Sequence, residues 1–348
     1  MTRVIELSRA QILAHRLRAN GLVERVSPGP GSLRRAAWAG LTDSVPRAAL
    51  LSIHARLKDT RPDALDDPAL VQVWGPRFSA YAVAADDRAP FTVGRMPDEP
   101  RKAAEVTGIA DRLEAFLDGR RMSYSEAGHA MGVPPNSLRY ATLTGRVLLR
   151  WDGSGRPEIW MVPPPESSPG DARLELARRH LHVMGPGTAQ SFGDWAGIRA
   201  PRASATMRTL EPELVPVRTP VGAGWILASD ESSFTAPAAG LSPVDPLAVR
   251  LLPSGDAYWL AQGRDRALLV PEAAQRAALW PSRVWPGALL LGGEIAGTWR
   301  RADADIRITA WRDLSPAERN AIEGEARSLP LPGVGDSVRV TWVADSST

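Results

Sequence analysis

The stretch that decides the fold is TAQSFGDWAGI (188–198), which has a counterpart 65 positions earlier in SYSEAGHAMGV (123–133). In this alignment Ser123 coincides with Thr188, and the glycines and most of the small or apolar positions coincide as well. A serine or threonine before such a segment predicts the N-cap of a short helix, and a glycine after it predicts the end. We therefore expect one structural unit to occur twice in this chain.

The segments around the two copies also correspond. The hydrophobic spacing predicts an amphipathic helix upstream of each copy, and a short arginine-bearing helix and a hairpin downstream. The first hairpin is expected to turn at residues 152–155 and the second near residues 222–224. Helix, helix, recognition helix and hairpin is the order of a winged-helix domain, although a unit of this shape need not touch DNA.

The N-terminal block reads as short helices followed by a strand. Ser8 and Gln11 form a capping box at the first of them. PRAALLSIHARL (46–57) predicts a further helix, for which Pro46 is a suitable first residue. The segment 69–87, ALVQVWGPRFSAYAVAADD, is expected to pass from helix into strand.

The last block, from residue 247, has a different character. Its apolar runs are short and strand-like, Gly292 and Gly293 predict a hairpin turn, and Ser315 with Glu318 predicts the capping box of one helix. We expect Leu290 and Trp299 to be buried in this block, and residues 338–348 to add a last strand before the chain end.

Together these patterns predict an α+β protein of tandem winged-helix domains followed by a small β-barrel-like domain. The predicted winged-helix domains are three in number and span residues 1–100, 101–165 and 170–235. The predicted C-terminal domain spans residues 245–348. A chain of 348 residues is long enough for several small domains.

Composition narrows the class of protein. The 42 basic residues exceed the 39 acidic ones only slightly, but Lys58 and Lys102 are the only lysines. Such a bias towards arginine indicates phosphate and base contacts or, equally, a genome rich in GC codons. The absence of cysteine excludes thiol catalysis and fits a reducing cytoplasm, where we expect the protein to act. No apolar run approaches the length of a membrane span.

Cofactors and metals are not predicted. The sequence has no P-loop, and no glycine-rich dinucleotide motif lies at a strand–helix junction. His180 and His182 form an H-x-H pair without a nearby run of carboxylates or thiols, so we expect one buried and one exposed histidine rather than a metal site.

Several long stretches resemble one known family. RRHLHVMGPGTAQSFGDWAGI (178–198) is similar to its third winged helix, and residues 250–271 and 289–301 are similar to its barrel. LSRAQILAHRLRANGL (7–22) resembles its opening helix. The family is that of the AlkZ/YcaQ-like winged-helix DNA glycosylases, and the resemblance covers nearly the whole chain.

The resemblance implies where a catalytic site would lie. Active members carry Gln, an apolar residue and then Gln or Asp just before a helix like PRAALL, and these side chains position the water that attacks C1′ of the damaged nucleotide. The two positions fall here on Thr42 and Ser44, with Asp43 between them. A second pattern, Arg-Gly-Thr-aliphatic-His, falls on RFSAY, which keeps Arg77 and has Tyr81 in place of the histidine.

Three interpretations of Thr42, Asp43 and Ser44 are open. They can cap the helix that follows, they can be a degenerate site in a protein that still binds DNA, or Asp43 can act as the water-activating base. Hydrolysis of an N-glycosidic bond needs an oriented water and stabilisation of positive charge on the sugar. Threonine and serine hydroxyls supply neither a charge nor the paired geometry of two amides. Whether the protein is a monofunctional DNA N-glycosylase is therefore undecided by sequence.

Arginines are expected to line a channel for duplex DNA. They flank the turn at 42–44, or lie on the two recognition helices and the first wing, and solvated surfaces with balancing acidic residues are the alternative. The predicted DNA contacts are Arg34, Arg35, Arg47, Arg77, Arg139, Arg146, Arg156, Arg199, Arg202 and Arg208.

We therefore predict a cytoplasmic, cofactor-free monomer that binds double-stranded DNA in the context of damage. It would act on or recognise alkylated or bulky lesions as a divergent relative of DNA glycosylases. The main alternative is a non-enzymatic lesion or DNA binder that serves as a regulator or a self-resistance factor. A protein or small-molecule ligand is a third alternative.

Overall fold

The computed structural model describes residues 3–45, 47–151, 153, 155–236, 244–331 and 338–343. Pro46, Asp152 and Ser154, which the sequence analysis placed at a helix start and a hairpin turn, lie outside the described residues. The N-terminal block contains β1 (Ile5–Glu6), α1 (Arg9–Ala19), α2 (Ser32–Ala36), β2 (Leu41–Thr42), α3 (Ala48–Arg56), β3 (Leu70–Trp74), the 3-10 turn η2 (Pro76–Phe78), β4 (Ala80–Ala84) and α4 (Arg88–Phe91).

The two copies of the repeated unit share the order of two helices, a further short helix and a two-stranded hairpin. The first contains α5 (Pro100–Leu117), β5 (Met122–Ser123), α6 (Tyr124–Ala130), η5 (Pro135–Thr144), β6 (Val147–Arg150) and β7 (Glu158–Met161). The second contains α7 (Pro169–Met184), α8 (Ala189–Ala196), α9 (Ala200–Leu210), β8 (Leu214–Thr219), β9 (Gly222–Leu227) and α10 (Glu231–Thr235). The predicted caps are confirmed, because the Ser123 side chain accepts from Ser125 N and Thr188 forms a capping box with Ser191.

A six-stranded sheet joins the N-terminal block to the first repeat copy. Its strand order is β2-β4-β3-β6-β7-β5, and Gln72 of β3 pairs with Leu149 of β6. This sheet crosses residue 100, so the predicted boundary there does not separate two sheets. The predicted domain boundaries stay predictions.

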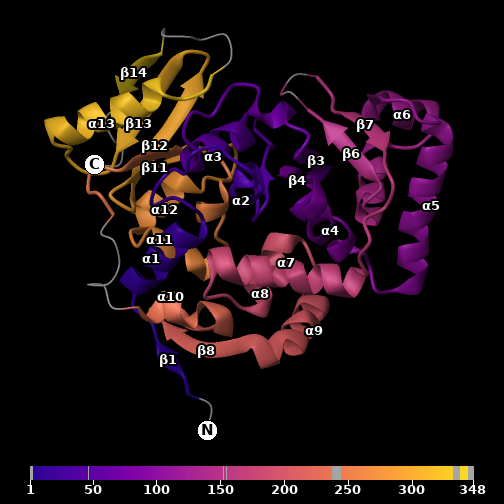
Figure 1. Cartoon of the computed structure of the whole chain (residues 1–348), viewed down its shortest axis with the longest axis horizontal. Coiled ribbons are helices and arrows are strands. Elements are labelled where there is room, and N and C mark those ends of the chain that lie inside the picture. Colours follow the sequence, from indigo (N-terminus) through magenta and orange to yellow (C-terminus); the bar gives the residue numbers. More distant parts are fainter. Residues whose placement is uncertain are drawn as a thin grey trace.

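The chain start is fixed to the second repeat copy. β1 pairs in parallel with β8 in a three-stranded sheet of order β1-β8-β9, and Figure 1 shows these strands side by side near the N-terminus. Arg16 of α1 is almost fully buried and donates to the carbonyl oxygens of Gly185 (2.9 Å) and Met184 (2.5 Å) at the end of α7. Asn20 Nδ2 donates to the carbonyl of Val183 at 2.9 Å.

The C-terminal block is mostly sheet. It contains β10 (Val249–Leu252), α11 (Arg266–Leu269), α12 (Ala273–Leu279), β11 (Gly287–Leu291), β12 (Glu294–Ala302), β13 (Asp305–Ala310), α13 (Pro316–Arg327) and β14 (Arg339–Trp342). The order β10-β11-β12-β13-β14 is an open one, and no pairing between β10 and β14 closes it among the described residues. The expected barrel-like closure is therefore corrected to an open five-stranded sheet, with α13 packed against β10 and β14.

Several local predictions in this block are confirmed. Gly292 and Gly293 have φ angles of 58° and 87° and form the turn between β11 and β12. Ser315 and Glu318 form the capping box of α13. Trp299 and Leu290 are buried, with 4% and 2% of their surfaces exposed.

The short arginine-bearing helix predicted downstream of the first copy is present at residues 135–144, in the 3-10 form. Two local expectations were wrong. Residues 70–84 form two strands joined by the 3-10 turn η2, with no α-helix, because alternating valines extend β3 and Gly75 N bonds to Ser79 O in a tight turn to β4. The second hairpin turns at residues 220–221, so Gly222 already belongs to β9.

The C-terminal block is also joined to the N-terminal block through a buried ion pair. Arg56 of α3 donates to both carboxylate oxygens of Asp256, at 2.7 and 3.0 Å, and the side chains are 5% and 0% exposed. Arg9 of α1 reaches the same block, where it bonds to Leu268 O and pairs with Glu294. These contacts hold α3 and α1 against the C-terminal block.

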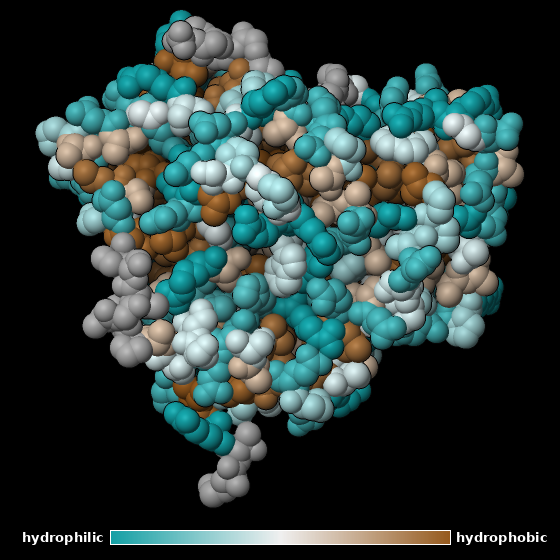
Figure 2. Space-filling model, viewed as in Figure 1, coloured by the Kyte–Doolittle hydropathy of each residue, from teal (hydrophilic) through white to brown (hydrophobic). Residues whose placement is uncertain are grey.

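The surface shown in Figure 2 is largely hydrophilic, with hydrophobic residues visible over the C-terminal sheet and near β6 and β7. None of the described helices is long and apolar enough to cross a membrane.

Candidate nucleic-acid interface

Segments from three blocks of the chain converge on a pocket of about 410 Å³, which we call the central pocket. Its walls come from the turn after β2, η2 and β4, helix α8, and two loops of the C-terminal block at 253–255 and 281–286. The lining includes the polar or charged side chains of Thr42, Ser44, Arg77, Tyr81 and Arg283. All four positions implied by the two family patterns therefore meet in one cavity.

Thr42 lies at the base of one wall. It pairs with Tyr81 across β2 and β4, and its hydroxyl donates to Gly255 O at 2.7 Å. Gly255 has a φ of +76°, and a Cβ atom there would lie 2.6 Å from Thr42 Oγ1. Glycine at 255 thus allows the C-terminal loop to approach Thr42. Ser44, two residues on, is exposed and lines the same pocket.

Asp43 faces away from the central pocket, of which it is not a lining residue. Its side chain is 2% exposed, Oδ1 accepts from Ala49 N of α3 at 3.0 Å, and Oδ2 accepts from Gln72 Nε2 at 2.7 Å. Burial raises the pKa of the Asp43 carboxyl from 3.8 to about 6, although the Ala49 N–H, Arg150 and Gln72 favour the charged form. This geometry favours the helix-capping interpretation of Asp43.

Tyr81 of β4 and Arg77 of η2 line the pocket beside Thr42. The Tyr81 ring is buried against Phe91, and burial raises the pKa of its phenol, which is therefore neutral at pH 7. Arg77 is exposed and has a φ of 57°, a left-handed conformation that is uncommon outside glycine. A Cβ atom on Gly197 would lie 3.0 Å from Arg77 N, so the end of α8 packs closely against this residue.

The chemistry available in the central pocket is limited to hydroxyls and cations. The lining residues that the structure describes include no Asp, Glu, His, Asn or Gln. Arg77 and Arg283 can bind phosphate, and Trp195 and Trp285 offer apolar surface for a base. The pocket can therefore bind a nucleotide, but none of these lining residues is a general base that is active near pH 7.

Comparison with known proteins identifies the family. The sequence model described as "DNA glycosylase AlkZ-like" matches residues 35–330, which is most of the chain. The chain belongs to the AlkZ-like DNA glycosylase family. Its fold is similar to the solved structure of Streptomyces sahachiroi DNA glycosylase AlkZ, with a TM-score of 0.76 over 97% of this chain and 100% of that one, at 16% sequence identity.

A curated relative is similar over a shorter span. The "Interstrand DNA cross-link repair glycosylase" of Streptomyces sahachiroi is 28% identical over 167 residues. That alignment covers 45% of this chain and only 42% of the relative's length. Family membership thus rests on the family model that matches residues 35–330, and the AlkZ-like fold rests on the similarity of the two structures.

The arginines predicted to contact DNA in this AlkZ-like chain fall into two groups. In one group the side chains already have protein partners: Arg34 pairs with Asp87, Arg146 with Asp111 and Glu114, Arg199 with Glu99, Arg202 with Asp98, and both Arg139 and Arg156 donate to the Tyr124 hydroxyl. In the other group the side chains have no carboxylate within ion-pair distance among the described residues: Arg35, Arg47, Arg77 and Arg208.

Sequence reasoning missed the cations that the C-terminal block supplies. Arg283 lines the central pocket, and Arg300 and Arg301 line an adjoining pocket of about 300 Å³, which we call the side pocket. The two pockets share Val45 and Trp285 in their linings. The local sequence carried only a weak signal for these cations, because SRVWPG resembles an ordinary surface loop and only the fold brings it into the same pocket as Thr42.

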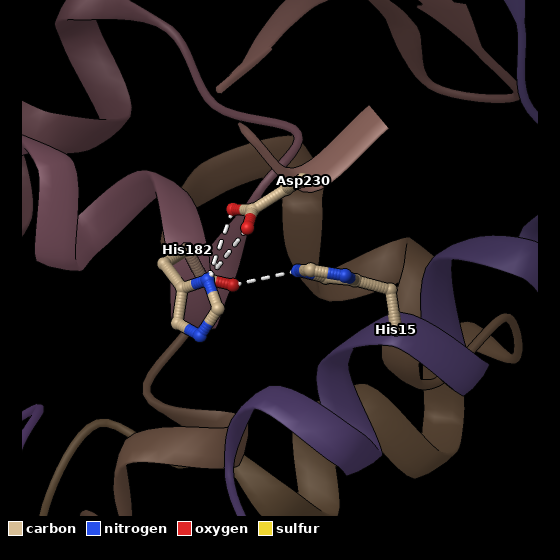
Figure 3. Close-up of side chains that lie close together, drawn as sticks. All are labelled: His15, His182 and Asp230. Atoms are coloured by element: carbon tan, nitrogen blue, oxygen red, sulfur yellow. Dashed lines mark hydrogen bonds and ion pairs between the residues drawn. The ribbon is translucent and has the colours of Figure 1, made fainter. Parts of the chain in front are cut away.

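A histidine–aspartate cluster lies outside the central pocket. Figure 3 shows His15, His182 and Asp230, whose potential ligand atoms lie within 4.8 Å of one another. His182 Nδ1 is 2.9 Å from Asp230 Oδ2, and His15 Nε2 is 2.7 Å from the His182 carbonyl oxygen. His15 Nδ1 also bonds to Ser233 Oγ at 2.9 Å, and burial lowers the pKa of His15 to about 4. Hydrogen bonding accounts for the contacts of this cluster, which a metal ion would have to displace.

Proposed function

We propose that this AlkZ-like protein recognises damaged double-stranded DNA and accommodates an altered nucleotide in the central pocket. The observation that carries the proposal is a nucleotide-sized pocket lined by arginine, hydroxyl and tryptophan side chains at the family's catalytic positions. Its volume of about 410 Å³ lies in the range of small-molecule sites. Arg77 and Arg283 in the lining have no carboxylate within ion-pair distance among the described residues, and their charges suit the negative DNA backbone.

The same pocket supports recognition over rapid hydrolysis. The Thr42 hydroxyl donates a hydrogen bond to Gly255 O, and the Asp43 carboxylate accepts hydrogen bonds from Ala49 N and Gln72 Nε2 inside the protein. Neither residue then holds a water as a pair of amides or an exposed carboxylate would, and the loss of such positioning costs about 10²-fold or more in rate. We propose a protein that binds alkylated or bulky lesions and releases their bases slowly or not at all.

The arrangement of the chain supports a tandem winged-helix architecture for this role. We propose winged-helix units at residues 1–100, 101–165 and 170–235 and a separate sheet unit at 245–348. The order of α5, α6, η5 and the β6–β7 hairpin, repeated in α7, α8, α9 and β8–β9, supports the second and third units. We expect the protein to act as a monomer in the cytoplasm, whose reducing conditions suit a cysteine-free chain.

A binding experiment tests the proposal. Fluorescence anisotropy would measure the affinity for a short duplex, with and without a bulky alkylated guanine, over a range of NaCl concentrations. We expect tighter binding to the damaged duplex and a log–log salt slope of several units. Arg77→Ala with Arg283→Ala should reduce the slope by about one per arginine.

The control is Arg327→Ala, which removes an exposed arginine that pairs with Glu323 on α13. It should leave both affinity and slope unchanged. An interaction that is absent at low ionic strength, or indifferent to salt, contradicts DNA recognition and favours a protein or small-molecule ligand.

A second candidate function is base excision through Asp43. The raised pKa of Asp43, about 6, is the kind of perturbation found in general bases, and the chain belongs to a glycosylase family. For this role the turn at 43–45 would have to reorient so that the carboxylate faces the central pocket. Asp43→Asn should then abolish base release while leaving DNA affinity intact.

A further inference from the structure

The loop at 281–286 presents an apolar tip to solvent. Val284 is 66% exposed, more than any other large hydrophobic residue among those that the structure describes. The loop lies between α12 and β11, and Pro281 and Pro286 bracket its tip. Val284 and Val45 are both exposed and both line the side pocket, so the exposed apolar surface here is shared by two residues rather than scattered singly.

The loop is held rigidly. Trp285 Nε1 donates to Pro281 O across the loop at 3.0 Å, and Arg300 Nη2 donates to Val284 O at 3.1 Å. The Trp285 ring packs against Trp259 with a centroid distance of 5.6 Å, and the Arg266 guanidinium lies 5.4 Å from the Trp285 ring centroid. Two prolines and these contacts restrict the conformations of the tip, so little entropy would be lost when Val284 is buried by a partner.

Cations surround this tip. Arg283 lines the central pocket on one side of it, and Arg300 and Arg301 line the side pocket on the other. None of the three has a carboxylate within ion-pair distance among residues 3–45, 47–151, 153, 155–236, 244–331 and 338–343. Val45, which is 37% exposed, lines both pockets.

We propose that the loop at 281–286 is a wedge that inserts Val284 into the base stack of duplex DNA beside the nucleotide held in the central pocket. A base stack is an apolar slot between two phosphate backbones, and it therefore matches an apolar tip flanked by arginines. Proteins that bend or open DNA insert apolar side chains between base steps in this way. Val284 would fill the space that an altered nucleotide leaves when it enters the pocket.

This inference rests on the proposed function, and its test separates the two. The probes are a short intact duplex and the same duplex with a tetrahydrofuran abasic analogue, which leaves a ready-made gap in the stack. A 2-aminopurine next to the gap becomes brighter when its stacking is disturbed. Anisotropy measures both affinities for the wild type, Val284→Ser, Val284→Leu and the control Val4→Ser, which alters a valine that is 51% exposed near the chain start.

The wild type and Val4→Ser should prefer the gapped duplex by about tenfold, as expected for burial of a valine side chain. Val284→Ser should lose most of this preference and the 2-aminopurine signal, retain affinity for the intact duplex, and show an unchanged melting temperature. Val284→Leu should retain both the preference and the signal.

Two results would overturn the wedge. If Val284→Ser keeps the full preference and signal while binding remains salt-sensitive, the wedge is wrong and DNA recognition stands. If the wild type binds neither duplex at low salt, both the wedge and the proposed function fail.

Discussion

At Asp43 one residue combines a structural role with a perturbed ionisation. Its carboxylate bonds to the backbone of α3 and to Gln72 of β3, so it fixes the turn between β2 and α3 from the inside. The neighbouring Thr42 and Ser44 face the central pocket instead. Because side chains alternate in an extended segment, the middle residue of the family's catalytic pattern points inward and its flanking residues point to the ligand.

The buried carboxylate predicts a pH dependence of stability. The pKa of Asp43 in the folded protein, about 6, lies above its ordinary value of 3.8, so its contribution is most favourable below pH 4 and declines as the pH rises to 6. The wild type should lose about 2 kcal/mol of unfolding free energy relative to Asp43→Asn between pH 4 and pH 7. Urea unfolding of both proteins at several pH values measures this difference, and parallel pH profiles would contradict the buried carboxylate.

Removal of the side chain tests the capping role directly. Asp43→Ala leaves Ala49 N–H and the Gln72 amide without their acceptor, and should lower the unfolding free energy by about 1–2 kcal/mol at pH 4. Thermal or urea unfolding gives the value. A neutral effect would show that water replaces the carboxylate without cost.

At the scale of elements, sequence patterns correctly predicted the helix caps and the turn, which depend on contacts between residues close together in the chain. The capping boxes at Ser8 and Ser315, the N-cap at Thr188 and the Gly292–Gly293 turn involve residues within a few positions of one another, and all appear in the structure. The strand pair at 70–84 was misread, because its first strand is completed by pairing with β6, more than 60 residues later. The open C-terminal sheet was also not evident, since strand patterns give no information on closure.

Trp299 tests the register of the C-terminal sheet. It lies opposite Gly287, and its indole N–H donates to Leu252 O at 2.8 Å. Trp299→Ala should cost about 3–5 kcal/mol of unfolding free energy, as large aromatic deletions in cores do, and Trp299→Phe should cost less. Calorimetry or urea unfolding provides the measurement. Near-wild-type stability of Trp299→Ala would contradict this register.

At the scale of the whole molecule, long-range contacts assemble the site. The family resemblance indicated Thr42, Ser44, Arg77 and Tyr81, but Gly255 and Arg283 join them only because the C-terminal block packs against the turn after β2. Periodicity and spacing in the sequence do not predict a contact between residues more than 200 positions apart. For the same reason, sequence could not show that Arg202 and Arg146 are already paired with acidic residues.

The Arg56–Asp256 pair should be essential to this assembly. Asp256→Asn leaves a buried guanidinium without its counter-charge, and should cost about 3–5 kcal/mol of unfolding free energy. The matched control is Asp305→Asn, which removes one partner of the exposed pair with Arg339 and should cost less than about 1 kcal/mol. Similar losses for the two variants would show that the first pair is not buried.

The most direct test of recognition without rapid excision is a single-turnover assay with protein in excess over an end-labelled duplex that carries an alkylated guanine. Retention of the duplex and alkali-induced cleavage are scored in the same samples. We expect the wild type to retain the damaged duplex with little cleavage, and Thr42→Gln with Ser44→Gln to gain weak cleavage, because paired amides again hold a water. Robust base release by the wild type would contradict the proposed function; if it persists in Asp43→Asn, catalysis through Asp43 is excluded as well.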